Sequence, residues 1–98
     1  MTNDETYHTA RPGDKFKVIQ GYNGNPFSLS TGTTVRRPNP GVYVPLPEGY
    51  VIEFECEAPN GNVWFEFVHP ETGKPMRGKS QSGSIHNLIT YGCLTPDR

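Results

Sequence analysis

The stretch from Tyr50 to His69, YVIEFECEAPNGNVWFEFVH, decides the fold class of this chain. Apolar and polar residues alternate on both sides of Asn60-Gly61, and such alternation is typical of strands with one buried face. Asn-Gly is the strongest short hairpin signal, because a type I′ turn needs positive φ at both central residues. The stretch therefore predicts two antiparallel strands joined by a two-residue turn.

The position of the turn predicts which side chains share a face. If Pro59 pairs with Asn62, one face of the hairpin is apolar and the other carries four carboxylates and an indole. The predicted core pairs are Cys56–Phe65 and Phe54–Phe67, and the predicted outer pairs are Glu57–Trp64, Glu55–Glu66 and Glu53–Val68. Like charges directly opposite each other destabilise a sheet, so the Glu55–Glu66 pair is a conflict that other residues must offset.

Length and composition predict one small domain. The chain has 98 residues, of which 33% are hydrophobic, 11 are Gly and 10 are Pro, so we expect short elements and many loops. A formal net charge of −1 gives no basic footprint, which disfavours nonspecific nucleic-acid binding. The polar, acidic start does not resemble a signal peptide, and no run approaches the ~18 apolar residues of a membrane span. We therefore expect a cytoplasmic protein, in the host cytoplasm if a bacteriophage encodes it.

The expected fold is all-β, with about five short antiparallel strands. Strands are expected at 15–20 and in both halves of 50–69, with shorter β-prone segments at 33–36 and 42–44. The run 76–83 is polar and is expected to be mobile, and 84–91 to form a strand or a short helical turn leading into one. The expected divisions are a flexible arm at 1–11, a barrel domain at 12–92 and a C-terminal tail at 93–98. The predicted core residues are Phe16, Val18, Ile52, Phe54, Cys56, Phe65 and Phe67.

The opening GDKFKVIQGYNGNPFSLSTGTTVRR, with the later EGYVIEF, VWFEF and SIHNLITYG, resembles the order of small Src-homology-3-like barrels. In those barrels a Gly-Asp-led first strand enters a long polar loop and returns through a Gly-Thr turn. The resemblance covers residues 12–92 and implies a barrel of the kind common in small bacterial and bacteriophage proteins. The stretches KFKVIQGY and SIHNLITY differ from the ALYDY-type and Pro-Ser-Asn-Tyr motifs of peptide-binding domains, so the proline-groove residues are not carried over.

An acidic and aromatic face is the first candidate site. A Trp on a polar face beside a turn has the character of residues that dominate protein interfaces, and the glutamates would steer a basic partner surface. The alternatives are that Trp64 covers a barrel end and that the glutamates form an ordinary solvated face. The predicted partner-binding residues are Trp64, Glu53, Glu55, Glu57, Glu66, Tyr43 and Tyr50.

Two cationic clusters in expected loops favour an alternative function, nucleic-acid binding. They consist of Arg36, Arg37, Lys74, Arg77 and Lys79. A third possibility is a structural module that associates through an exposed strand edge. Binding to nucleic acid would fall steeply as salt rises, whereas an edge-mediated assembly would self-associate.

No motif indicates catalysis, a metal or a cofactor. Cys56, His69, His86 and Cys93 lie 13, 17 and 7 residues apart, without the close ligand pairs of zinc sites. Neighbouring carboxylates resemble a glycosidase pair, but here they would lie on a convex open sheet. No Gly-rich loop precedes a helix. The sequence therefore predicts a non-enzymatic protein-binding module, such as a phage-type accessory or inhibitor protein, with neither metal nor cofactor.

Overall fold

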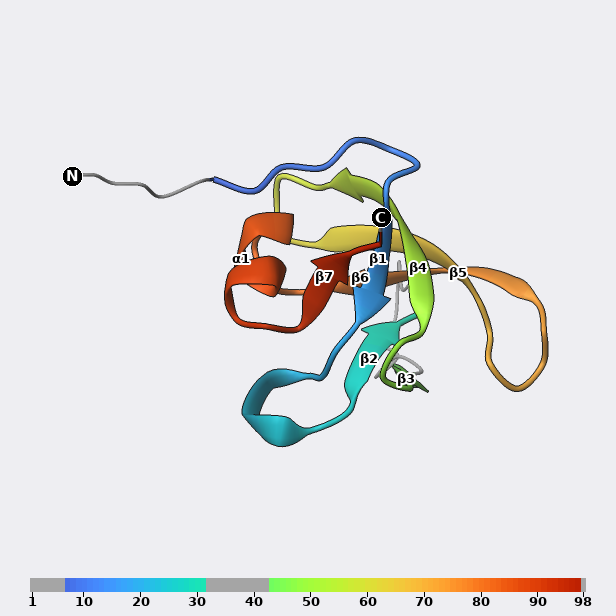
Figure 1. The fold of residues 1–98 in the computed structure, drawn as a ribbon. Helices are drawn as coiled ribbons and strands as arrows, with labels where there is room; N and C mark the ends of the chain where they lie inside the picture. Colours follow the sequence, from blue (N-terminus) through green and yellow to red (C-terminus); the bar gives the residue numbers. More distant parts are fainter. Residues whose placement is uncertain (1–6, 32–42, 98) are drawn as a thin grey trace.

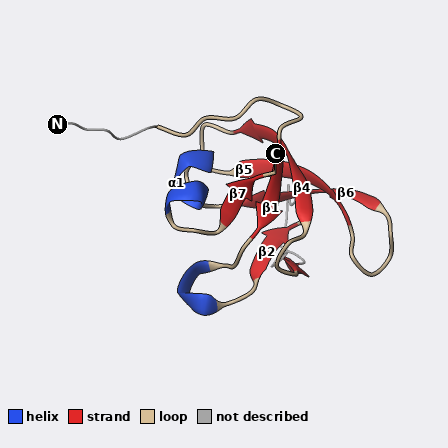
Figure 2. Cartoon of the chain, viewed as in Figure 1, coloured by secondary structure: helices blue, strands red, loops and turns tan. Residues whose placement is uncertain are grey.

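The fold of the chain is a curled antiparallel sheet with one short helix against its end (Figures 1 and 2). The computed structural model describes residues 7–31 and 43–97. Within them, seven strands form one sheet in the order β3-β2-β6-β5-β4-β1-β7. The elements are β1 (Lys15–Val18), η1 (Tyr22–Gly24), β2 (Phe27–Ser30), β3 (Tyr43–Leu46), β4 (Val51–Glu57), β5 (Val63–Val68), β6 (Pro75–Ser80), α1 (Ile85–Thr90) and β7 (Leu94–Pro96). The all-β prediction is confirmed. The sheet is curled into a half-barrel and has seven strands, where about five were predicted.

The inner face of the half-barrel and the apolar side of α1 form a single core. Six of the seven predicted core residues are buried, namely Phe16, Val18, Ile52, Phe54, Phe65 and Phe67. The core also contains Phe27, Leu29, Val44, Leu46, Val63, Ile85, Leu88, Cys93 and Leu94. The seventh predicted residue, Cys56, is only half-buried, because the register of its strand differs from the prediction.

The predicted hairpin forms, but its loop has three residues rather than two. Ala58 N donates to Asn62 O at 2.8 Å, and Gly61 N donates to Ala58 O at 3.1 Å. Gly61 has a positive φ of 89°. Pro59 fixes its own φ near −65°, which suits the first central position of an ordinary turn followed by a left-handed Gly. Pro59 therefore moves the turn one residue towards the N-terminus.

A β-bulge at Glu55 changes the faces of β4. Phe54 lies opposite Phe65 before the bulge, and Cys56 lies opposite Trp64 after it. One extra residue reverses the alternation, so Cys56 joins Trp64 on the outer face. The three-residue loop shifts the register by one position and the bulge shifts it by one more. All five predicted pairs are therefore wrong, namely Cys56–Phe65, Phe54–Phe67, Glu57–Trp64, Glu55–Glu66 and Glu53–Val68.

The run expected to be mobile contains a strand instead. β6 pairs with β5 continuously from Val63↔Ser80 to Val68↔Pro75. Gly78 is buried there, where an added Cβ would lie 2.9 Å from Leu29 Cβ and 3.0 Å from a ring carbon of Phe67. Close approach of neighbouring side chains favours Gly at such a position, and this Gly masked the alternation in the sequence.

The C-terminal segment closes the α1 end of the sheet. Ser84 Oγ accepts a hydrogen bond from Asn87 N at 3.2 Å, as an N-cap does. Residues 84–91 thus form the short helical turn leading into a strand, one of the two predicted possibilities. β7 pairs with β1 through Phe16↔Pro96, so Leu94–Pro96 within the expected tail at 93–98 form a strand. Among the described residues, no helix is long and apolar enough to cross a membrane.

Candidate binding face

The outer side of β4, β5 and β6 brings together charged and aromatic side chains that we call the Trp64 face. Directly opposite residues of antiparallel strands point to the same side of a sheet. The strand registers therefore place on this face Glu53, Cys56, Trp64, Glu66, Arg77 and Lys79. Glu55, the bulge residue, joins them through its hydrogen bond with Arg77. The sequence assigned the glutamates and Trp64 to one candidate site and Arg77 and Lys79 to another, and the pairing of β6 with β5 brings both sets onto one face.

Arg77 is held between an aromatic ring and a carboxylate. Its guanidinium carbon lies 4.1 Å from the centre of the Trp64 ring, and its Nε donates to Glu55 Oε1 at 2.6 Å. The hydrogen bond to Glu55 is the main cause of the raised pKa of Arg77. Lys79 Nζ lies 5.5 Å from the same ring centre. Both distances lie within the range of cation–π attraction, so the half-buried indole and the two cations support one another.

The predicted conflict between like charges exists, but between different residues. Glu53 lies opposite Glu66. Lys15 Nζ lies 4.0 Å from Glu53, and Arg77 is the β6 neighbour of Glu66. The face therefore has mixed charges rather than the predicted acidic stripe, because β1 and β6 supply cations beside the glutamates.

Tyr43 extends this face towards the edge of the sheet. A cross-strand row runs over five strands through Cys56, Trp64, Lys79, Ser30 and Tyr43. Tyr43 is 65% exposed. Two aromatic side chains thus lie on one face with a lysine between them.

Other predicted site residues lie elsewhere. After the bulge, Glu57 is opposite the buried Val63, and its Oε2 accepts from the backbone N–H of Ile85 at 2.7 Å. It therefore caps α1. Tyr50 is half-buried and its hydroxyl donates to Val68 O. Lys74 lies in the β5–β6 loop, and the predicted Arg36 and Arg37 lie outside the described residues.

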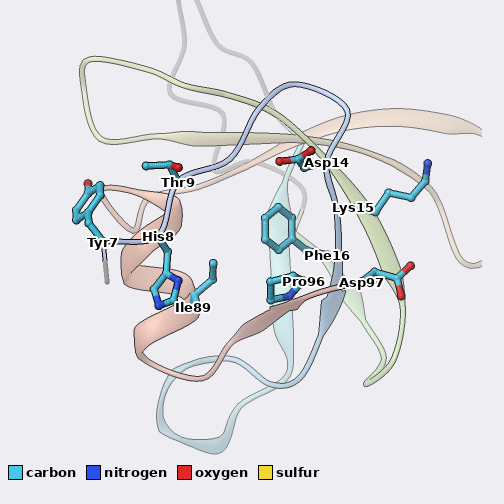
Figure 3. Close-up of a pocket in the computed structure, with 9 residues that line it drawn as sticks. All are labelled: Tyr7, His8, Thr9, Asp14, Lys15, Phe16, Ile89, Pro96 and Asp97. Carbon is cyan, nitrogen blue, oxygen red and sulfur yellow. The ribbon is translucent and has the colours of Figure 1, made fainter. Parts of the chain in front are cut away.

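A cleft of 430 Å³ lies at the α1 end (Figure 3). Its lining comes from the N-terminal arm, β1, α1 and the end of β7, and consists of Tyr7, His8, Thr9, Asp14, Lys15, Phe16, Ile89, Pro96 and Asp97. The sequence did not indicate this cleft, because its walls are distant along the chain and no local motif joins them.

Ring contacts attach the arm to α1. The Tyr7 and His86 rings stack with centres 4.4 Å apart, and the His8 ring lies 5.3 Å from His86 on centres. His8 N donates to His86 Nδ1 at 3.0 Å. Of the expected flexible arm at 1–11, residues 1–6 lie outside the described part, and residues 7 and 8 contact the helix.

The described residues contain no group of three or more His, Cys, Asp or Glu side chains that could hold a metal ion. Cys93 is buried, and burial raises the pKa of its thiol, which disfavours the reactive thiolate. No protein-family model, curated protein or solved structure matches this chain. Function must therefore be inferred from the chemistry of the two surfaces.

Proposed function

We propose that this chain is a non-enzymatic protein-binding module that holds its partner through the Trp64 face. The observation that carries the proposal is the placement of Arg77 between the Trp64 ring and Glu55. Trp, Tyr and Arg are enriched among the residues that contribute most to protein binding. An arginine already held in place loses less conformational freedom on association, so this arrangement favours binding.

The partner surface we infer carries charges of both signs. Glu53 and Glu66 lie in one cross-strand row with Lys15 and Arg77. Charge patterns of this kind determine orientation and association rate more than affinity. The sequence analysis expected a partner with a basic surface. A purely basic surface would be repelled by the cations of β1 and β6.

The narrower proposal is a small Src-homology-3-like barrel of phage type, acting in the host cytoplasm as an accessory or inhibitor of a host protein. Its support is the small curled antiparallel sheet together with the resemblance of residues 12–92. The absence of a catalytic motif in the sequence is consistent with a role exerted through binding.

A second candidate is binding of single-stranded nucleic acid on the same face. The row through Trp64, Lys79 and Tyr43 combines rings for base stacking with a cation between them. Three carboxylates on that face, Glu53, Glu55 and Glu66, oppose it by repelling phosphates. Steep loss of affinity with rising salt would identify this second function.

The test first captures the partner protein and then measures its affinity for this chain. A photo-crosslinking residue at Ser30, which lies in the cross-strand row, should capture the partner from a bacterial lysate, whereas the same residue at Glu48 should not. Trp64→Ala should then weaken the purified complex by about 2 kcal/mol, roughly 30-fold. Tyr22→Ala is the matched control, because Tyr22 is an exposed aromatic residue on η1. Loss of binding in Tyr22→Ala but not in Trp64→Ala would refute the proposal.

A further inference from the structure

The cleft beneath the N-terminal arm (Figure 3) adjoins the Trp64 face at Lys15 but shares none of the residues of that face. We propose that it is a binding site for a primary alkylammonium group. The same chemistry occurs in free alkylamines and in lysine side chains. The apolar floor, the charges at the rim and the attachment of the arm support this assignment separately.

The floor of the cleft is apolar and suits an alkyl chain. Phe16, Ile89 and Pro96 supply it from β1, α1 and β7. In Figure 3 the Phe16 ring and Pro96 lie in the middle of the lining residues, with Tyr7, His8 and Ile89 on one side and Lys15 and Asp97 on the other. An alkyl stem can cover such a surface while its charged end stays at the wet rim. A fully polar ligand would leave this floor uncovered.

The rim carries two carboxylates, Asp14 and Asp97, of which Asp97 is paired with Lys17, and one lysine, Lys15, which is paired with Glu53 outside the cleft. Asp14 Oδ2 accepts from Arg11 N at 2.9 Å, and Asp97 Oδ1 lies 3.7 Å from Lys17 Nζ. A carboxylate has about four acceptor positions, so each retains capacity for an ammonium. Lys15 Nζ lies 4.0 Å from Glu53 on the Trp64 face. Among the described residues Asp14 has no ion-pair partner, so Asp14 is the group at the rim that favours a cation over an anion.

The arm gives the cleft its third wall before any ligand binds. Its two ends are attached, by His8 N to His86 Nδ1 at 3.0 Å and by Gly13 N to Phe54 O at 2.9 Å. A site that is already formed requires less ordering on binding. The volume of 430 Å³ lies within the roughly 300–1,000 Å³ range of small-ligand sites.

The experiment is a titration of the whole chain, followed by amide NMR shifts, with n-butylammonium, n-butanol and butyrate. Butylammonium should shift amides of the cleft lining with a dissociation constant in the millimolar range, about 1–10 mM. Butanol and butyrate should bind at least about tenfold more weakly, because each lacks the cation that the rim favours. Equal shifts with butanol would overturn the proposal, since the cleft would then bind apolar chains without regard to charge.

Variants test which groups act. Asp14→Asn with Asp97→Asn should weaken butylammonium binding at least about tenfold, whereas Glu48→Gln, a carboxylate outside the lining, should not change it. If the double variant unfolds, the two single variants give the same comparison. Unchanged affinity in folded Asp→Asn variants would refute the assignment.

N-acetyl-lysine methylamide identifies the source of the ammonium group. Its binding supports a lysine side chain as the ligand, and its failure to bind where butylammonium binds supports a free amine. Trp64→Ala should leave all these affinities unchanged.

Discussion

The Trp64 face and the arm cleft both lie at the surface, but they are held in different ways. On the Trp64 face, three neighbouring strands hold a guanidinium between an indole and a carboxylate. In the cleft, one wall is a terminal segment attached to α1 by ring stacking and a backbone hydrogen bond. The sheet orders the first region, whereas the second depends on a few local contacts.

The two proposals connect this difference with different ligands. A broad surface fixed by sheet pairing can meet a protein partner without rearranging. A hollow with one separable wall can admit a small ligand and let it leave. Substitutions in each region test these descriptions. They show whether sheet packing holds the Trp64 face firmly, and whether the arm can detach from α1 without unfolding the sheet.

The largest effect is expected in the core beneath the Trp64 face. Phe65→Ala should lower the free energy of unfolding by about 3–5 kcal/mol, because Phe65 is fully buried. Tyr7→Ala, in the exposed arm, should change it by no more than about 0.5 kcal/mol. Urea denaturation measures both. A loss below about 1 kcal/mol for Phe65→Ala would mean that Phe65 does not lie on the core-facing side of β5.

Gly78→Ala should cost about 1–3 kcal/mol through overpacking. Its new methyl group would lie 2.9 Å from Leu29 Cβ, which cannot swing away as a side-chain end can. Lys79→Ala is the control on the same strand, since Lys79 lies on the outer face. Equal small losses for both variants, measured by denaturation, would contradict the observed packing of β6 on the core.

The same strands differ in how well the sequence predicted them. The hairpin, the first strand and six core residues follow from alternation, which is a local property of the chain. The bulge at Glu55 does not follow from alternation. The residues of β4 still alternate in the sequence, while the extra residue reverses the side of the sheet to which they point. β6 was missed because a buried Gly interrupts its apolar positions.

The composition of the candidate site was harder still to predict. Glu55 and Arg77 are 22 positions apart, and only strand pairing brings them together. The sequence identified Trp64 and the glutamates but placed the cations in a separate cluster. The arm cleft had no sequence signal, since its walls meet only after the sheet curls and α1 docks.

Stability should fall as the pH rises past about 8.5, the ordinary pKa of a cysteine thiol. Burial raises the pKa of Cys93 in the folded state, so the unfolded chain loses its proton first and is favoured at higher pH. Although Tyr22 is exposed as a residue, desolvation of its partly buried hydroxyl is the main cause of its raised pKa, which extends the loss towards pH 10 and above. Denaturation at several pH values should show a shallower decline for Cys93→Ala. An identical decline would exclude Cys93 as a cause.

A smaller effect distinguishes two glutamates on the Trp64 face. Glu66→Gln removes the like-charge contact with Glu53 and should raise stability by a few tenths of a kcal/mol. Glu55→Gln should lower stability slightly, because it weakens the hydrogen bond to Arg77. Thermal melts at low salt compare the two variants. The same sign for both would contradict the pairing described for this face.

The smallest change in stability is expected at the arm. His86→Ala removes both the stacked ring and the acceptor for His8 N–H. Amides of residues 7–10 should become mobile on the nanosecond timescale in NMR relaxation, while global stability changes by no more than about 0.5 kcal/mol. His69→Ala, in the β5–β6 loop, should leave these amides unchanged. Global unfolding of His86→Ala would mean that the arm is an integral part of the fold.

The central claim, that the Trp64 face meets the protein partner, can be tested on one side chain. The chain has a single Trp, so labelling it with 5-fluorotryptophan gives one fluorine NMR signal from the middle of the face. Adding the captured, unlabelled partner should shift or broaden this signal and reduce its response to a solvent paramagnetic agent. An unchanged signal and unchanged solvent exposure at a saturating partner concentration would contradict the account.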